Sequence, residues 1–202
     1  KAAHGSMPEL GINAVTKCME EIVNSGAGSS FAEFYMKHIG WDVNGNNIGC
    51  GFMDEKSGVL TMNPGMIRTT EDCIILSIDV RCPIDYAGED VINAMKEFCA
   101  PYGIEVKMTA WKAPVYTDVN GPVLKAITDA YREMTGDYES VSRTMGGGTY
   151  ARAMKNIVAI GVVMPGHENR EHMSNEYILE EDLILDRKIY AKALERLANI
   201  GF

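Results

Sequence analysis

Four histidines and a glycine triplet are the parts of this sequence whose residue types suit chemistry. The histidines are His4, His38, His167 and His172, and the triplet is Gly146-Gly147-Gly148. No two histidines share a helix at ligand spacing, and the sequence has no HExxH, GxSxG or GxxxxGK[ST] motif. The backbone N–H groups of a glycine triplet can cradle an anion, and the same triplet also suits a tight turn. Spacing alone therefore indicates an α/β protein and leaves its activity open.

The predicted helices and strands fall into two regions. In the first region, a capping box at residues 6–9 predicts a helix over 6–24, and apolar spacing predicts further helices over 31–38 and 89–100. Strands are predicted over 49–53, 58–62, 73–81 and 104–108. This order matches a ferredoxin-like α+β sandwich that lacks its first strand.

The composition changes near residues 113–114, and a second region follows. It has predicted helices over 122–135, 149–154 and 179–200, with strands over 139–142 and 156–164. The apolar run of 156–164 is typical of a strand buried on both faces. We therefore predict an α/β (α+β) chain with domains 1–113 and 114–202, the second being half of an α/β domain.

Charge and cysteine content exclude several classes of protein. The net charge of -9 argues against a nucleic-acid backbone or an anionic membrane as partner, and no apolar stretch is long enough to span a membrane. Five cysteines without a CxxC pair indicate reduced thiols in a cytoplasmic protein. The chain begins at Lys1, without a secretory signal pattern, which leads us to expect a fragment, a processed product or a trimmed chain.

Five short motifs add a family resemblance. Residues 3–14 (AHGSMPELGINA) resemble the AH-x-S-x-P-x-x-G-x-N-A motif of dinuclear zinc peptidases, a family that includes peptidase V, succinyl-diaminopimelate desuccinylase and the carboxypeptidase G type. The other matches, in family order, are 60–65 (LTMNPG), 78–83 (IDVRCP), 147–152 (GGTYAR) and the H-x-x-NE of 165–178. The resemblance is closest to peptidase V and covers essentially the whole chain.

This resemblance implies a lid domain (1–113) and the carboxyl-terminal part of a catalytic domain (114–202). His172 would be a ligand of one of two zinc ions, with Asn175 and Glu176 supporting it. The family's H-x-D pair, bridging Asp, Glu-Glu pair and further acidic ligand are not found and would precede Lys1. We therefore expect this chain alone to bind zinc weakly and to be inactive.

The remaining roles implied by the resemblance concern the substrate. His4 would donate a hydrogen bond to the oxyanion, and Arg81 would bind the substrate carboxylate. Asn63 would add an amide donor, and Gly147 and Gly148 would offer backbone N–H groups. Arg152 stays open between a substrate contact and a salt bridge. His38, His167 and the five cysteines are expected to be structural.

The implied reaction is zinc-dependent hydrolysis of a dipeptide with a free C-terminal carboxylate, performed as part of a larger enzyme. N-acyl amino acid deacylation, desuccinylation or carboxypeptidase activity remains an alternative within the family. An alternative of another class is a non-catalytic dimerisation or binding module, and a homodimer is compatible with either.

Overall fold

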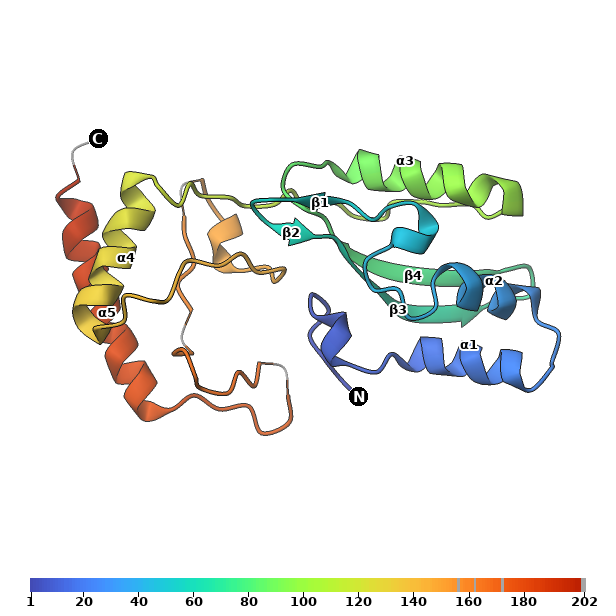
Figure 1. Cartoon of the computed structure of the whole chain (residues 1–202), viewed down its shortest axis with the longest axis horizontal. Coiled ribbons are helices and arrows are strands. Elements are labelled where there is room, and N and C mark those ends of the chain that lie inside the picture. Colours follow the sequence, from blue (N-terminus) through green and yellow to red (C-terminus); the bar gives the residue numbers. More distant parts are fainter. Residues whose placement is uncertain (156, 162, 172, 201–202) are drawn as a thin grey trace. The chain divides into compact units, whose positions relative to one another are not determined.

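The computed structural model describes residues 1–155, 157–161, 163–171 and 173–200. The chain forms two compact units. The first unit contains Lys1–Pro114 together with Met145–Gly147, and the second contains Val115–Thr144 and Gly148–Phe202 (Figure 1). Because the tripeptide Met145–Gly147 belongs to the first unit, part of the glycine triplet lies in the unit that carries His4.

The first helix of the first unit begins later than the sequence predicts. A single 3₁₀ turn, Pro8–Leu10, stands where the capping box was expected, and α1 spans Ala14–Asn24. Asn13 is its N-cap, with a side-chain oxygen that accepts from the N–H groups of Val15 and Thr16. The prediction of one helix over 6–24 was wrong, because the extended backbone at Asn13 starts a new helix there.

The other two helices of this unit confirm the predicted positions. Helix α2 spans Ser30–His38, and Ser29 caps it by accepting from the N–H of Ala32. Helix α3 spans Gly88–Cys99. Figure 1 shows α1 and α2 side by side at one side of the strands and α3 at the other.

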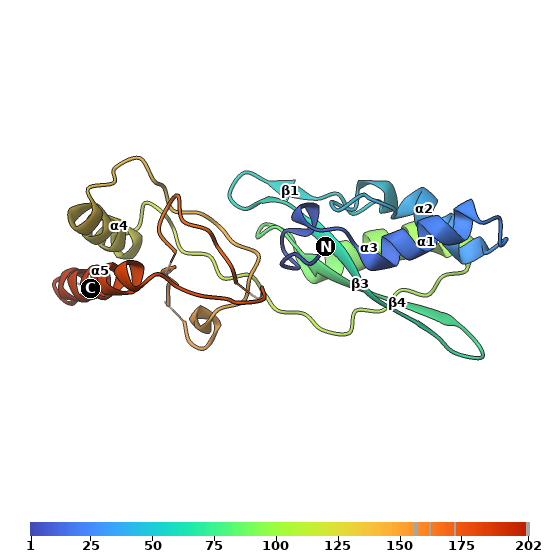
Figure 2. The same ribbon diagram turned by 90° about the horizontal axis from the view of Figure 1, so that it is seen from below.

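Two antiparallel hairpins complete the unit. The shorter pairs β1 (Met53–Asp54) with β2 (Gly58–Val59), and the longer pairs β3 (Thr61–Thr69) with β4 (Ile74–Arg81). The register of the longer hairpin sets Asn63 opposite Asp79, with a bulge between Pro64 and Met66. Figure 2 shows the far end of this hairpin extending past the helices.

The core of the first unit lies between its helices and the longer hairpin. Its fully buried side chains include Tyr35, Ile48, Leu60 and Met62. The hydroxyl of Thr16 donates to the carbonyl of Gly40 at 3.2 Å and accepts from the hydroxyl of Tyr35 at 2.7 Å. These two buried hydroxyls therefore have partners, as is usual for polar groups in a protein interior.

The predicted strand over 104–108 is absent. These residues are described and form no ladder, although Ile104 and Val106 pack against the core. Alternating burial fixes which side chains face inward, whereas a strand also needs a neighbouring edge to bond. The unit thus combines helices with two small sheets, and the ferredoxin-like arrangement remains a prediction.

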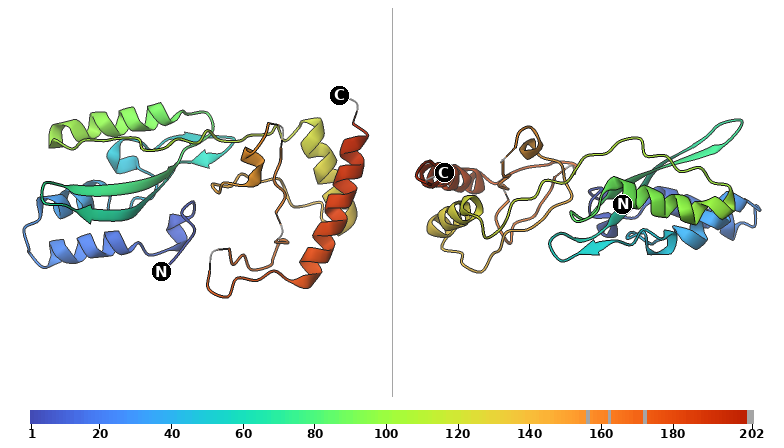
Figure 3. Two further views of the ribbon diagram at one scale, coloured as in Figure 1. Left: turned by 180° about the vertical axis from the view of Figure 1, so that it is seen from behind. Right: turned by 90° about the horizontal axis from the view of Figure 1, so that it is seen from above.

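The second unit is built on two helices. Helix α4 spans Pro122–Thr135, as predicted, and α5 spans Glu180–Ala198. They lie side by side in every view (Figure 3). Their contact buries Ala126 and Ala130 from α4 and Ile189 and Ala193 from α5.

The strands predicted in the second unit are absent from its described residues. Residues 139–142 are irregular, and so are 157–161 and 163–164, while residues 156 and 162 lie outside the described part. The apolar run 156–164 has no paired neighbour there that could form a sheet with it. A single 3₁₀ turn, Tyr150–Arg152, replaces the predicted short helix over 149–154.

No helix in the described part of the chain has both the length and the apolar character needed to cross a bilayer.

Candidate functional site

One face of the longer hairpin collects polar side chains from both strands. Side chains alternate between the faces of a strand, so Thr61 and Asn63 of β3 point the same way, as do Asp79 and Arg81 of β4. The register pairs Thr61 with Arg81 and Asn63 with Asp79. We call these four residues the polar face. The opposite face carries Met62 and Pro64, which are buried.

In the described part of the chain, the polar face contains the Asp79–Arg81 ion pair and two buried polar atoms without a partner. Arg81 Nη2 lies 2.6 Å from Asp79 Oδ2, and the two side chains are 35% and 46% exposed. Thr61 Oγ1 and Arg81 Nε are buried and have no hydrogen-bond partner among the residues that the structure describes. Buried polar atoms without a partner are uncommon, and at a functional site they indicate an interaction still to be made.

The turn at His4–Met7 fixes the tautomer of the neutral histidine ring. The backbone N–H of Ser6 donates to His4 Nδ1 at 3.2 Å, and the Ser6 hydroxyl lies 2.7 Å from the same nitrogen. A backbone N–H can only donate, so Nδ1 must be the acceptor. The neutral ring therefore carries its proton on Nε2, and His4 is a donor through that nitrogen.

Gly5 brings this turn against the polar face. A Cβ placed on Gly5 would lie 3.4 Å from Asp79 Oδ2, 3.9 Å from Asn63 Nδ2 and 4.0 Å from Arg81 Nη2. The backbone that links His4 and Ser6 is thus in contact range of three polar side chains. A larger residue at position 5 would stand between the turn and the polar face.

Gly146 and Gly147, although distant in sequence, also lie close to the His4–Met7 turn. A Cβ on Gly146 would overlap the Ser6 Cβ and lie 3.5 Å from Arg81 Cγ. A Cβ on Gly147 would lie 3.7 Å from His4 Cε1. At position 146 a side chain would collide with Ser6, so glycine allows this close approach to the turn.

Asn13 links the polar face to helix α1. Its side-chain oxygen caps the helix, while its Nδ2 donates to Asn63 Oδ1 at 3.0 Å and to the carbonyl of Pro64 at 2.8 Å. The Asn13 side chain thus caps a helix and also holds the side-chain amide of Asn63, which is predicted to bind substrate.

The structure brings together His4, Asn63, Arg81 and Gly147 from the predicted set. Gly148 belongs to the second unit, where a Cβ on it would lie 3.7 Å from Arg152 Nε. The predicted zinc ligand, His172, lies outside the described residues.

Sequence reasoning missed three participants. Ser6 was interpreted as part of a helix cap and instead bonds His4. Asn13 lies in the first motif without an assigned role, although an Asn before an apolar helix signals a cap. Asp79 shares the alternation of Arg81, and the spacing i, i+2 already places both on one face.

The cysteine beside Arg81 is unsuited to nucleophilic chemistry. Burial raises the pKa of the Cys82 thiol to about 11, and the pKa of Cys50 in the core is raised to about 11 for the same reason. A thiol with such a pKa is almost entirely protonated near neutral pH, and the thiolate is the nucleophile.

One group of possible metal-ligating atoms occurs among the described residues, in the second unit. The ligand atoms of His167, Glu181 and Asp182 all lie within 4.8 Å of one another. Imidazole nitrogen and carboxylate oxygen are donors that zinc accepts, so the chemistry of the set fits a metal. However, His167 Nδ1 and Asp182 Oδ2 already form a 2.8 Å hydrogen bond, which accounts for their closeness without an ion.

The carboxylates of this region have unequal surroundings. The hydrogen bond that His167 donates to the Asp182 carboxylate raises the pKa of His167. Asp186, one turn further along α5, is 3% exposed, and both its oxygens lack a partner within the described residues. Burial, followed by the charge of Asp182, raises the pKa of Asp186.

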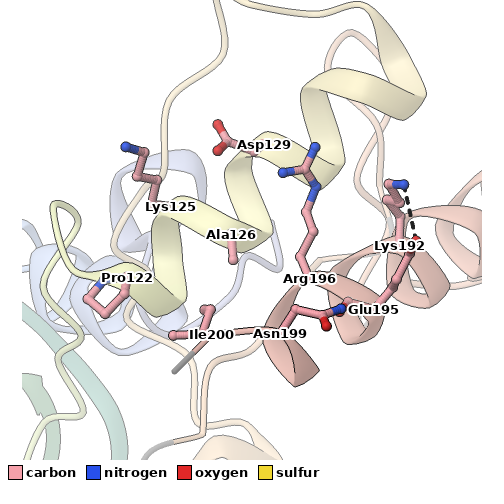
Figure 4. A pocket seen from close by; sticks show the side chains of 9 residues that line it. All are labelled: Pro122, Lys125, Ala126, Asp129, Lys192, Glu195, Arg196, Asn199 and Ile200. Carbon is pink, nitrogen blue, oxygen red and sulfur yellow. Dashed lines mark hydrogen bonds and ion pairs between the residues drawn. The ribbon is translucent and has the colours of Figure 1, made fainter. Parts of the chain in front are cut away.

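A groove of about 430 Å³ runs between α4 and α5 (Figure 4). Its charged residues are Lys125, Asp129, Lys192, Glu195 and Arg196. Lys192 lies 3.1 Å from Glu195, and Lys192 and Arg196 also pair with a glutamate of α4, Glu133. Both α5 cations of the groove are therefore already paired with glutamates.

The polar face and the His4–Met7 turn therefore present a set of hydrogen-bond donors. His4 Nε2, Asn63 Nδ2 and the Arg81 guanidinium all donate, and a carbonyl or carboxylate oxygen is the group that accepts from such a set.

A match to a family model assigns the chain to a protein family. Residues 3–196 match the model of peptidase family M20/M25/M40, and the chain belongs to this family. It is a peptidase family that generally depends on a metal.

Individual relatives agree with this placement. A Staphylococcus epidermidis protein bearing the name "Putative dipeptidase" is 32% identical over 201 residues, which cover 98% of this chain and 43% of that protein. A Staphylococcus aureus (strain USA300) protein named in the same way is 30% identical over 201 residues, with the same coverage. The chain thus spans less than half the length of these relatives.

Proposed function

We propose that this chain supplies the substrate-recognition part of a zinc-dependent dipeptidase of the peptidase V type. In this proposal the first unit acts as the lid domain, and the substrate is a dipeptide with a free C-terminal carboxylate. The observation that carries it is the fixed Nε2–H form of His4 beside the polar face. The dipeptidase names of the two relatives support the substrate class.

Each residue of the first unit has a distinct task in this proposal. Arg81 binds the substrate carboxylate through its guanidinium, and Asn63 adds an amide N–H. Ser6 holds the His4 ring so that Nε2–H donates to the oxygen on which negative charge develops. Gly147 leaves room for the substrate backbone next to the ring.

The metal would be held outside the first unit. His172 is the proposed ligand in this chain, in agreement with the H-x-x-NE motif around it. A bound zinc pair would supply an activated water and polarise the scissile carbonyl. The remaining ligands and the general base would come from residues that correspond to the other part of the relatives' length.

The deciding experiment measures metal content and dipeptide hydrolysis in the full natural chain that carries these residues. The substrates are alanylalanine, its C-terminal amide and N-acetylalanine. We expect the free dipeptide to be hydrolysed fastest. Preference for N-acetylalanine would replace the dipeptidase proposal with a deacylase, and no hydrolysis with metal present would indicate a binding module.

Two variants test the assignment of roles. His172→Ala is expected to lose zinc, whereas the matched His167→Ala in the same segment is expected to keep it. His4→Ala is expected to keep zinc and to lower kcat by about 10²–10³. Zinc lost only from His167→Ala would move the ligand to the His167 group, and an unchanged kcat in His4→Ala would remove the catalytic role.

A third variant tests carboxylate recognition. Arg81→Ala is expected to raise KM for alanylalanine strongly and to leave KM for its amide nearly unchanged. The matched control is Arg68→Ala, since Arg68 is an exposed arginine on the same hairpin. Equal losses on the dipeptide and on the amide would contradict the assignment.

A further inference from the structure

The side chain of Asn13 uses its full hydrogen-bonding capacity. An amide side chain has two acceptor positions on oxygen and two donor hydrogens on nitrogen. The oxygen of Asn13 accepts from Val15 N at 2.8 Å and Thr16 N at 3.2 Å. The nitrogen donates to Asn63 Oδ1 at 3.0 Å and to the Pro64 carbonyl at 2.8 Å.

These partners leave only one orientation for the Asn13 amide. The oxygen and nitrogen of an amide side chain look alike, and their assignment depends on the surrounding hydrogen bonds. Here the two groups on one side are backbone N–H donors, and the Pro64 carbonyl on the other side can only accept. A reversed amide would place donor against donor and acceptor against acceptor.

The fixed amide of Asn13 in turn fixes Asn63. Because Asn13 Nδ2 donates, the atom of Asn63 that meets it must be its oxygen. The NH₂ group of Asn63 then points away from Asn13, and a Cβ on Gly5 would lie 3.9 Å from that nitrogen. Within the described residues Asn63 Nδ2 makes no hydrogen bond, although Arg81 Nη2 lies about the same distance from that Cβ position.

We propose that Asn13 is a positioning residue that holds Asn63 as an obligate hydrogen-bond donor beside Arg81. The ligand class follows from this, because a carboxylate can accept from both groups and an ammonium cannot. The inference rests on the proposed function for the identity of that carboxylate, namely the C-terminus of a dipeptide. The orientation of the Asn63 amide itself rests on geometry alone.

The decisive variant is Asn13→Asp in the full natural chain. Aspartate caps helices as well as asparagine does, so α1 should be retained. Its second oxygen can only accept, so Asn63 is expected to rotate and donate toward position 13. Its oxygen would then face the substrate carboxylate, and KM for alanylalanine should rise about tenfold or more, because a hydrogen bond to a charged group is replaced by repulsion.

A second variant distinguishes a reversed Asn63 amide from an Asn63 amide that is merely free to rotate. Asn13→Ser also caps the helix, but its hydroxyl is too short to orient Asn63. We expect a KM between those of the wild type and Asn13→Asp, with the helix content of all three equal by circular dichroism. Equal KM values in the wild type and in Asn13→Asp would overturn the proposal.

A double-mutant cycle tests whether the negative charge introduced by Asn13→Asp acts on the substrate directly. If Asn13 acts through Asn63, then Asn13→Asp in an Asn63→Ala background should leave KM where Asn63→Ala alone puts it. A further rise of KM in the double variant would mean that the charge repels the substrate directly, and the positioning role would be refuted.

A measurement without substrate distinguishes this inference from the proposed function. In the wild-type chain, nuclear Overhauser contacts should join the Asn63 side-chain NH₂ to the Hα atoms of Gly5. In Asn13→Asp these contacts should weaken. Unchanged contacts would refute the inference, whereas the expected change without any hydrolysis would refute only the peptidase proposal.

Discussion

The two units contain buried polar side chains that differ in their hydrogen bonding, most clearly Thr16 in the first unit and Asp186 in the second. In the first unit, the buried hydroxyls of Thr16 and Tyr35 bond each other, and Asn13 satisfies all four of its hydrogen-bonding positions. In the second unit, Asp186 is buried on α5 with both oxygens unpartnered among the described residues. The Thr16–Tyr35 pair therefore adds hydrogen bonds to the core of the first unit, while the second unit carries a buried carboxylate whose burial costs free energy.

Large apolar side chains are exposed on both units. Helix α5 exposes Leu183, Ile184 and Leu194, and its apolar neighbour run 156–164 forms no strand in the described part. In the second unit, the predicted helices α4 and α5 are present, whereas the predicted strands are absent from the described residues. The site of the first unit does not depend on such segments, since its residues lie on a paired hairpin, a capped helix start and two tight approaches of glycine.

The largest expected effect tests the core of the first unit. Leu60 is completely buried, so Leu60→Ala should lower the free energy of unfolding by about 2–5 kcal/mol. The matched Leu124→Ala in the second unit, where the side chain is 9% exposed, should cost less because water can reach the space that is left. Urea unfolding followed by hydrogen exchange of each unit would measure both, and equal losses would remove the contrast.

The second prediction concerns the unpartnered carboxylate. Asp186→Leu should raise the free energy of unfolding by about 1–3 kcal/mol at neutral pH, because it removes a buried polar group without a partner. The pKa of Asp186 is raised above its usual value, so the folded state binds the proton more tightly than the unfolded state. Wild-type stability should therefore fall as pH rises from about 3.8 through the folded pKa, and the variant should lack this decline. A destabilised variant would show that Asp186 has a partner that matters.

The third prediction concerns the helix caps. Asn13→Ala should lower the free energy of unfolding by about 1 kcal/mol, since α1 loses a side-chain cap. The same change at Leu179, the N-cap of α5, removes no capping hydrogen bond, because that residue makes none through its side chain. Thermal unfolding of both variants would test this, and a larger loss at position 179 would reverse the contrast.

The smallest expected effect is the pH dependence contributed by His167. Its hydrogen bond with Asp182 raises the pKa of the imidazole, so its contribution to stability is complete below about pH 6.5 and declines as pH rises through the folded value. Since the ring is partly exposed, His167→Asn should change stability only slightly and mainly below that pH. Unfolding curves from pH 5 to 8 would detect it, and an equal loss at every pH would assign the effect to packing.

Sequence reasoning found most helices because apolar spacing and helix ends are local signals. The prediction for α4 agrees with the structure at both ends, and the strand predicted over 73–81 overlaps β4, which carries Arg81. The predictions of strands over 104–108 and 156–164 were wrong for the described residues. A strand must pair with a neighbouring strand, and the periodicity of a sequence does not specify that neighbour. The contacts of Gly146 with Ser6 and Arg81 join residues far apart in sequence, and no local pattern contains them.

The dual bonding of Asn13 limits which amino acids position 13 can accept. A helix cap alone would tolerate serine, threonine, aspartate or glycine with modest loss. A donor toward Asn63 narrows this choice, because among the common capping residues only asparagine also carries an NH₂ group. Random substitution at this one position should therefore yield variants that fold well and recognise ligand poorly, a class of neutral-looking changes that stability screens alone would pass.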